Sequence, residues 1–122
     1  MDLHESGEMY LETILMLKNQ NQYVRSIDIA HSMNFSKPSV SRAIKLLKES
    51  KLILVDSKGY IDFTEEGQKI AEKVYNRHTT LTAFLINLGV SHHQAEEDAC
   101  RWEHIVSEET YQCVQKFLKK QS

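Results

Sequence analysis

The sequence of 122 residues predicts a mainly α-helical fold. Apolar residues recur at three- and four-residue intervals through most of the chain, which is the spacing of amphipathic helices. Two short apolar runs, at 52–55 and 60–63, flank the turn-forming segment 56–59 (Asp-Ser-Lys-Gly) and predict a β-hairpin. A helix and a helix–turn–helix pair precede the hairpin, and three helices follow it. This order is typical of a winged helix-turn-helix domain, which we place at 1–72, followed by a helical domain at 73–122.

The first three helices have recognisable boundaries. The first runs from about residue 4 to 20, where Tyr10, Leu11 and Ile14 have helical spacing, and the polar segment 19–23 ends it. Ser26 is the expected N-cap of the second helix and Ser36 that of the third, because their hydroxyls can accept free backbone N–H groups. Proline at position 38 fits the first turn of the third helix, where its missing N–H costs nothing.

The later helices are predicted from their caps. Thr64 opens a long helix, which glycine at position 89 ends. Ser91, followed by Gln94, predicts a capping box for a helix that continues through Ile105. Ser107 opens the last helix, and the acidic residues after it suit the positive end of the helix dipole.

Composition excludes several classes of protein. No apolar run approaches the roughly 18 residues of a membrane span, and the N-terminus has no apolar core of a signal peptide. The two cysteines are expected as thiols in a cytoplasmic protein. The sequence has no nucleophile elbow, HExxH motif or glycine-rich phosphate loop, so we expect no enzyme and no catalytic residues.

The helix–turn–helix segment carries a local basic charge. The whole chain has a net charge of −2, but residues 25–51 contain six basic and two acidic side chains, a local charge of +4. The first residues of the second helix of such a unit face base edges, arginine can reach guanine, and lysines can reach phosphates. The candidate DNA-binding residues are Arg25, Ser36, Lys37, Pro38, Ser39, Ser41, Arg42, Lys45 and Lys58. A solvated basic face without a DNA partner is the alternative.

The segment ACRWEH, at 99–104, places Cys100, Glu103 and His104 at positions i, i+3 and i+4. On a helix these side chains share one face. A thiolate, a carboxylate and an imidazole together suit Fe(II), Mn(II), Co(II), Ni(II) or Zn(II). Further ligands could come from Met9, Glu12 and His78. Each of these residues alone is also typical of an ordinary core or surface position, so a structural role for ACRWEH stays open.

Several stretches resemble the diphtheria-toxin-repressor family of metal-dependent bacterial transcriptional regulators. They are EMYLETI near the start, SKPSVSRAIKLL in the helix–turn–helix, TEEGQKIA after the hairpin, RH at 77–78, and ACRWEH. The resemblance covers nearly the whole chain in order. It implies a homodimeric repressor that binds operator DNA when loaded with metal. Ending at residue 122, the sequence resembles the short members of the family, which lack a C-terminal barrel domain.

The resemblance also implies a ligand set. Iron-type members bind the regulatory metal through residues matching Met9, Cys100, Glu103 and His104. Manganese-type members also use residues matching Glu12 and His78, with the glutamate at 103 shared between two ions. This chain therefore combines both types. Thioether and thiol ligands shift the preference from Mn(II) toward Fe(II), Co(II), Ni(II) or Zn(II). Because the ligand set is iron-type, we expect Fe(II), with Mn(II) next and Co(II), Ni(II) or Zn(II) as substitutes in vitro. The alternative function is a winged-helix regulator that does not sense metal.

Overall fold

The computed structural model describes residues 5–121. The chain divides into two compact units, and the boundary between them along the sequence lies after Glu72. We call these the N-terminal unit and the C-terminal unit and describe each by itself. The described residues form six helices and one two-stranded antiparallel sheet, so the predicted mainly α-helical fold with a small hairpin is confirmed. No helix between residues 5 and 121 is both long and apolar enough to cross a bilayer.

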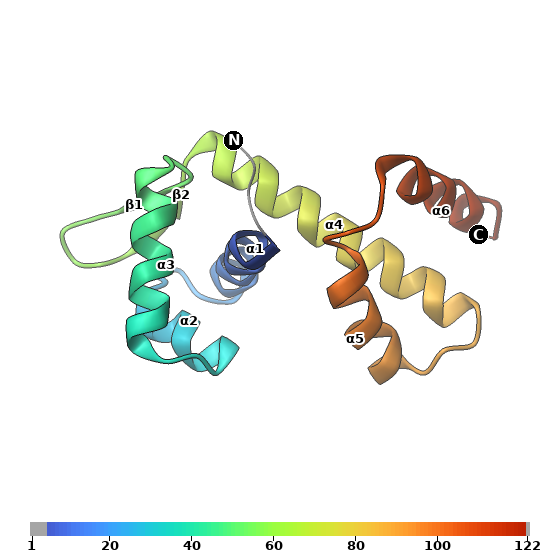
Figure 1. The fold of residues 1–122 in the computed structure, drawn as a ribbon, viewed down its shortest axis with the longest axis horizontal. Coiled ribbons are helices and arrows are strands. Elements are labelled where there is room, and N and C mark those ends of the chain that lie inside the picture. Colours follow the sequence, from blue (N-terminus) through green and yellow to red (C-terminus); the bar gives the residue numbers. More distant parts are fainter. Residues whose placement is uncertain (1–4, 122) are drawn as a thin grey trace. The chain divides into compact units, whose positions relative to one another are not determined.

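The N-terminal unit contains three helices, the hairpin and the start of a fourth helix (Figure 1). The elements are α1 (Glu5–Gln20), α2 (Ser26–Met33), α3 (Lys37–Glu49), β1 (Ile53–Val55), β2 (Ile61–Phe63) and the first part of α4 (Glu65–Asn87). The predicted start of the first helix at residue 4 lies outside the described residues. The two strands pair with Leu54 opposite Asp62.

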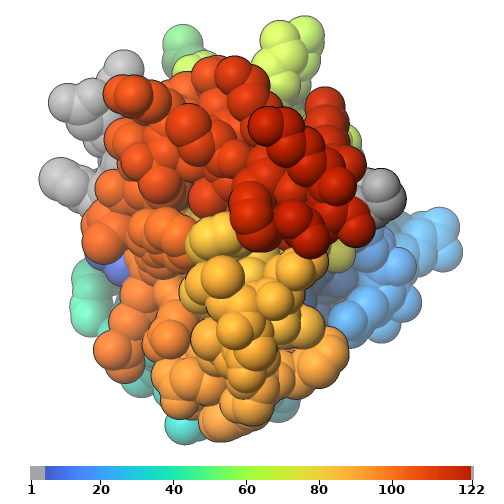
Figure 2. All heavy atoms as spheres, turned by 90° about the vertical axis from the view of Figure 1, so that its right-hand side faces the viewer, coloured from blue at the N-terminus to red at the C-terminus, as the bar shows by residue number. Residues whose placement is uncertain are grey.

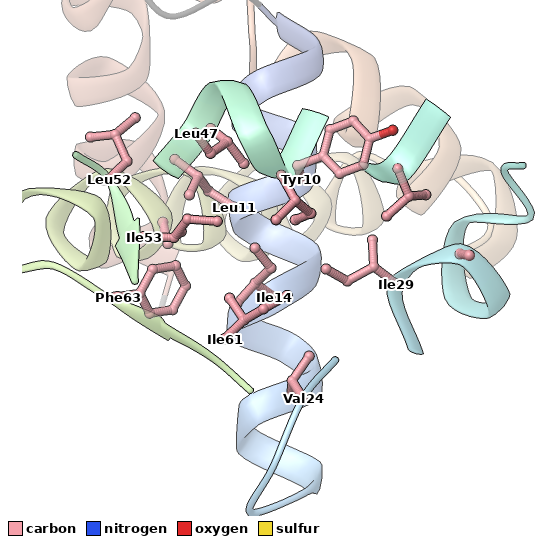
Figure 3. Packing of buried hydrophobic residues seen from close by; sticks show 14 residues of the cluster. Tyr10, Leu11, Ile14, Val24, Ile29, Leu47, Leu52, Ile53, Ile61 and Phe63 are labelled. Carbon is pink, nitrogen blue, oxygen red and sulfur yellow. The ribbon is translucent and has the colours of Figure 1, made fainter. Parts of the chain in front are cut away.

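The core of the N-terminal unit forms around α1. Leu11 and Ile14 of this helix are fully buried among side chains from α2, α3 and the hairpin, as Figure 3 shows. Gly67, in the first turn of α4, packs directly on the chain that enters the hairpin. A Cβ atom at this position would lie 1.8 Å from the carbonyl oxygen of Leu52, so only glycine allows this approach.

The C-terminal unit consists of the rest of α4 with α5 (His92–Trp102) and α6 (Glu108–Gln121). In Figure 2, α5 and α6 appear in orange and red on the side facing the viewer. Leu81 and Ala99 are fully buried in its core. The ring of Phe84 packs near Trp102 and meets Phe117 edge-on, so all three helices contribute to one apolar cluster.

Most predicted helix caps are confirmed. The side chains of Ser36, Thr64, Ser91 and Ser107 each accept a backbone N–H from the first turn of the following helix. The long helix ends as expected before Gly89, whose φ of +105° requires the left-handed region. Of the capping box predicted at Ser91, the structure gives the bond from the backbone N–H of Gln94 to the Ser91 hydroxyl, and the side-chain amide nitrogen of Gln94 donates to the carboxylate of Asp98.

Two predicted boundaries are wrong. The N-cap of α2 is Arg25, not Ser26, because the carboxylate of Asp28 accepts the backbone N–H of Arg25 at 2.8 Å. The helix carrying ACRWEH ends at Trp102 and does not continue through Ile105. Ile105 is 75% exposed, so it does not belong to the buried face that was predicted to continue through it.

Candidate metal centre and nucleic-acid interface

The first turn of α3 presents a short polar network. The hydroxyl of Ser36 donates to the Oγ atom of Ser39 at 2.8 Å, and Ser39 donates its backbone N–H to Ser36 at 3.3 Å. The guanidinium of Arg42 donates to the Oγ atom of Ser39 at 3.5 Å. These contacts hold the start of the helix and one arginine in a defined geometry.

The two faces of α3 differ in character. Val40, Ile44 and Leu47 are buried in the core of the N-terminal unit. Because the helix turns these residues inward, its other positions face outward. The exposed candidates from the sequence are Lys37, Pro38, Ser41, Arg42 and Lys45. This half of α3 therefore offers hydroxyls and cations to a polyanion.

Arg25 and Lys58 lie at the hairpin and not on α3. The guanidinium of Arg25 lies 4.7 Å from the centre of the Tyr60 ring, which stacks on Tyr23 at 4.5 Å. Lys58 is exposed at the hairpin tip, where its backbone N–H donates to the carboxylate of Asp56 at 2.9 Å. The candidate DNA-binding residues thus fall into two groups within the N-terminal unit.

Met9 and Glu12 lie on α1, three residues apart and so about one helical turn from each other. Met9 is half-buried, and Glu12 is 7% exposed. A buried carboxylate is costly unless its charge is compensated by a hydrogen bond, a cation or a metal. Glu12 is therefore not the solvated helix charge that its sequence position alone also allows.

The C-terminal unit brings together three of the predicted ligands. The carboxylate of Glu103 is fully buried, and its Oε2 atom lies 2.9 Å from Nδ1 of His78 on α4. Its Oε1 atom lies 3.2 Å from Nε2 of His104, whose side chain is also fully buried. We call His78, Glu103 and His104 the C-terminal cluster. Cys100 is half-buried in the last turn of α5.

The ACRWEH motif keeps its spacing even though α5 ends within it. Glu103 is the C-cap residue of α5 and retains helical dihedral angles (φ −58°, ψ −24°). Its backbone N–H still donates to Ala99 at 2.9 Å. His104 follows in a tight turn. The prediction that one helix carries all three ligands is therefore corrected: Cys100 is on the helix, Glu103 caps it, and His104 lies beyond it.

Sequence reasoning missed one residue beside this cluster. Arg77 immediately precedes His78 on α4, and its Nη1 atom donates to the backbone carbonyls of Glu103 at 3.4 Å and Val106 at 3.1 Å. Its Nη2 atom donates to the carboxylate of Glu108 at 2.8 Å. The signal was the pair RH at 77–78, from which only the histidine was assigned a role.

The donor atoms of the C-terminal cluster and of Cys100 are of types that suit a divalent transition metal. Two imidazole nitrogens approach the two oxygens of one buried carboxylate, and a thiol lies one helical turn before that carboxylate. Nitrogen, oxygen and sulfur donors of this kind suit borderline ions such as Fe(II), Co(II) and Zn(II) better than they suit magnesium or calcium. The residues present thus fit such an ion.

Comparisons with known proteins agree with both halves of the fold. Residues 2–67 match the family profile described as the iron dependent repressor, N-terminal DNA binding domain, and residues 64–122 match the profile of its metal binding and dimerisation domain. The chain belongs to the iron-dependent repressor family.

Relatives of this chain include proteins about twice its length and one of similar length. It is 30% identical over 119 residues to the diphtheria toxin repressor of Corynebacterium diphtheriae, covering 97% of this chain and 53% of that protein. It is also 30% identical over 120 residues to an HTH-type transcriptional regulator of Methanocaldococcus jannaschii, 96% of which it covers. The solved structure of the manganese regulator SloR has a TM-score of 0.82 at 32% identity, covering 93% of this chain and 53% of that one. The chain thus spans about half the length of the diphtheria toxin repressor and of SloR.

Proposed function

We propose that this chain is a metal-dependent transcriptional repressor that binds operator DNA as a homodimer when loaded with a divalent ion. Metal homeostasis genes are the proposed targets, the cytoplasm is the proposed site of action, and no catalytic activity is proposed. The observation that carries the proposal is the fully buried carboxylate of Glu103 between the imidazoles of His78 and His104. This arrangement occurs in a family whose profiles are named for iron, DNA binding and dimerisation.

The proposed ligands form two sites that share one glutamate. The first site consists of Met9, Cys100, Glu103 and His104. The second consists of Glu12 and His78 with the shared Glu103. The buried carboxylate of Glu12 supports its role, as do the short distances within the C-terminal cluster. When bound, an ion supplies positive charge that offsets the cost of burying these carboxylates.

The proposed DNA contacts use the polar half of α3 and the hairpin. Ser36, Lys37, Pro38, Ser39, Ser41, Arg42 and Lys45 would face the major groove and its phosphates, and Arg25 and Lys58 would contact the backbone beside it. The exposed positions of the cations on α3 support this assignment. The tether from Arg42 to Ser39 keeps its guanidinium near the start of the helix, where base edges are read.

In this proposal, metal binding affects DNA binding because the metal ligands come from both units. Met9 and Glu12 belong to the N-terminal unit, and the other four ligands belong to the C-terminal unit. Ligands from both units can hold the same ion only in a restricted set of arrangements. The two recognition helices of a dimer must in turn match groove positions about 34 Å apart. A coupling of about 1–3 kcal/mol per site is typical of such linkage.

Fe(II) is the favoured ion, with Mn(II) next and Co(II), Ni(II) or Zn(II) as substitutes in vitro. The thioether of Met9 and the thiol of Cys100 favour ions softer than manganese. Mn(II) is the second candidate because one similar structure is of a manganese regulator. A preference for iron would be contradicted if Mn(II) at micromolar concentration promoted operator binding as well as Fe(II) does.

Selection from a random pool of duplex DNA in the presence of each metal tests the proposal and returns the operator and the cofactor together. We expect enrichment of one palindromic sequence with Fe(II), and loss of its binding when a chelator is added. The remaining alternative is a regulator that does not sense metal. Equal enrichment of the same sequence by metal-loaded and chelated protein would support that alternative and reject ours.

A further inference from the structure

Arg77 and His78 approach Glu103 from the same turn of α4 but at different atoms. His78 meets the carboxylate of Glu103 at 2.9 Å, whereas Arg77 donates to its backbone carbonyl at 3.4 Å. Side chains of consecutive helical residues point about 100° apart, so Arg77 and His78 reach different parts of Glu103. The backbone carbonyl of Glu103 is available to Arg77 because Glu103 lies at the end of α5. Glu103 is therefore held at its side chain and at its main chain by neighbouring residues.

The contacts of Arg77 fall where the backbone lacks internal partners. The last carbonyls of a helix have no hydrogen-bond donor within that helix, and α5 ends directly before Glu103. Arg77 also donates to the carbonyl of Val106 at 3.1 Å, so one nitrogen spans both ends of the turn formed by residues 103–106. This turn carries Glu103 and His104, two of the three members of the C-terminal cluster.

Arg77 is itself fixed by the next helix. Its Nη2 atom donates to Glu108 in the first turn of α6 at 2.8 Å, and its guanidinium lies 5.3 Å from the centre of the Tyr111 ring. Only 13% of the side chain is exposed. A planar guanidinium offers several donors in fixed directions, which the single nitrogen of lysine cannot reproduce.

We propose that Arg77 is a positioning residue for the metal centre, because it holds the turn 103–106 in the conformation that presents Glu103 and His104 together. This inference rests on the proposed metal-binding function. Arg77 provides no ligand and acts through the backbone carbonyls of the turn. Its contribution is that the turn is ordered before the ion arrives, so less conformational freedom is lost on binding.

The test compares the full chain as wild type, Arg77→Met, Arg77→Lys and Arg101→Gln. Methionine keeps the apolar stem and removes every donor. Lysine keeps the positive charge but not the planar set of donors of the guanidinium. The Arg77→Lys variant is used for the test if Arg77→Met does not fold. Arg101 is an exposed arginine in the last turn of α5. Its backbone carbonyl accepts the N–H of His104, but Arg101→Gln leaves the backbone in place and removes only one positive charge near the same turn.

Two measurements are needed. Hydrogen–deuterium exchange on the metal-free proteins reports the order of residues 103–106, and titration with Co(II), followed by its visible absorption, reports ligand geometry and affinity. Arg77→Met and Arg77→Lys are expected to speed exchange in 103–106 at least tenfold, to weaken Co(II) binding at least tenfold and to shift the absorption bands at saturation. Arg101→Gln is expected to match wild type in both measurements.

Two results overturn the inference. One is unchanged exchange in both Arg77 variants; the other is faster exchange with wild-type affinity and an unshifted spectrum, which would make Arg77 a structural residue only. In both cases wild-type protein still binds Co(II), so the proposed function survives. If wild-type protein itself binds no Co(II), the proposed function fails, and the inference fails with it.

Discussion

The Nδ1 atom of His78 lies 2.9 Å from the Oε2 atom of Glu103. The two residues are 25 positions apart in sequence, and they meet because α4 passes beside the turn at which α5 ends. This distance is that of a hydrogen-bonded or ionic pair, and His104 approaches the other carboxylate oxygen at 3.2 Å. These three side chains are the ones we propose as metal ligands in the C-terminal unit.

Replacing the shared carboxylate should remove metal binding. Glu103→Gln keeps the size of the side chain but removes its charge, so both proposed sites lose a ligand. We expect affinity for Co(II) and Fe(II) to fall by more than the roughly 10–100-fold that loss of an outer-shell partner typically costs. Isothermal titration calorimetry measures the loss. Glu97→Gln, on an exposed carboxylate of α5, is the control and should bind as wild type does.

Arg42 should contribute to recognition of particular bases. Arg42→Ala is expected to cost about 1–3 kcal/mol of operator binding and to relax specificity at one position, because it removes a bidentate donor from the exposed face of α3. Fluorescence anisotropy on the selected operator and its single-base variants measures both effects. Lys116→Ala makes the same charge change on the exposed surface of α6, and an equal loss there would argue against base readout by Arg42.

Gly67 should not tolerate any side chain. Gly67→Ala places a Cβ atom 1.8 Å from the carbonyl oxygen of Leu52, so α4 and the start of the hairpin must move apart. Overpacking of this kind typically costs about 1–3 kcal/mol of unfolding free energy. We expect the upper end of this range, because the clashing atom belongs to the backbone of Leu52 and not to a flexible side chain. Urea denaturation measures the change in unfolding free energy. Glu66→Ala, on the exposed neighbour, should change it little.

The ion pair of Arg77 and Glu108 should make stability depend on pH. The hydrogen bond from Arg77 lowers the pKa of Glu108 below its ordinary value of 4.5. Because the pKa of Glu108 is lower in the folded protein than in the unfolded chain, its charged carboxylate stabilises the fold at pH values above 4.5. This stabilisation is lost as the pH falls through the pKa of the folded state. In urea denaturation, Glu108→Gln should be less stable than wild type at pH 7, and the difference should shrink as the pH falls below 4.5 and disappear once Glu108 is protonated in the folded protein. A difference that does not change across this acidic range would assign the effect to something other than this carboxylate.

The sequence was informative wherever a feature is local. The apolar spacing placed all six described helices, and the turn residues at 56–59 placed the hairpin. Ser36 and Thr64 were recognisable as caps, since a hydroxyl before an amphipathic run acts through neighbours three residues away. Spacing also identified Glu103 and His104, whose motif retains helical geometry through the end of α5.

Two helix boundaries and one residue beside the C-terminal cluster were not predicted. The boundary at α2 was misplaced although its cause is local: the carboxylate of Asp28, three residues after Arg25, accepts the backbone N–H of Arg25, whereas the sequence pattern favoured the hydroxyl of Ser26 as the cap. The end of α5 at Trp102 was missed as well, since Ile105, which was expected on the buried face, is exposed. Arg77 could not be assigned either, because its partners lie 26 to 31 positions away.

The most direct test of the central claim is a complete thermodynamic cycle for Fe(II) and operator DNA. Operator affinity is measured with and without Fe(II), and Fe(II) affinity is measured with and without operator, all on the same homodimer. The account predicts that each ligand raises the affinity for the other by the same factor, at least about fivefold for a coupling within the typical 1–3 kcal/mol, and that Glu103→Gln abolishes this coupling. Operator affinity that is the same in chelated and Fe(II)-saturated protein would contradict the account.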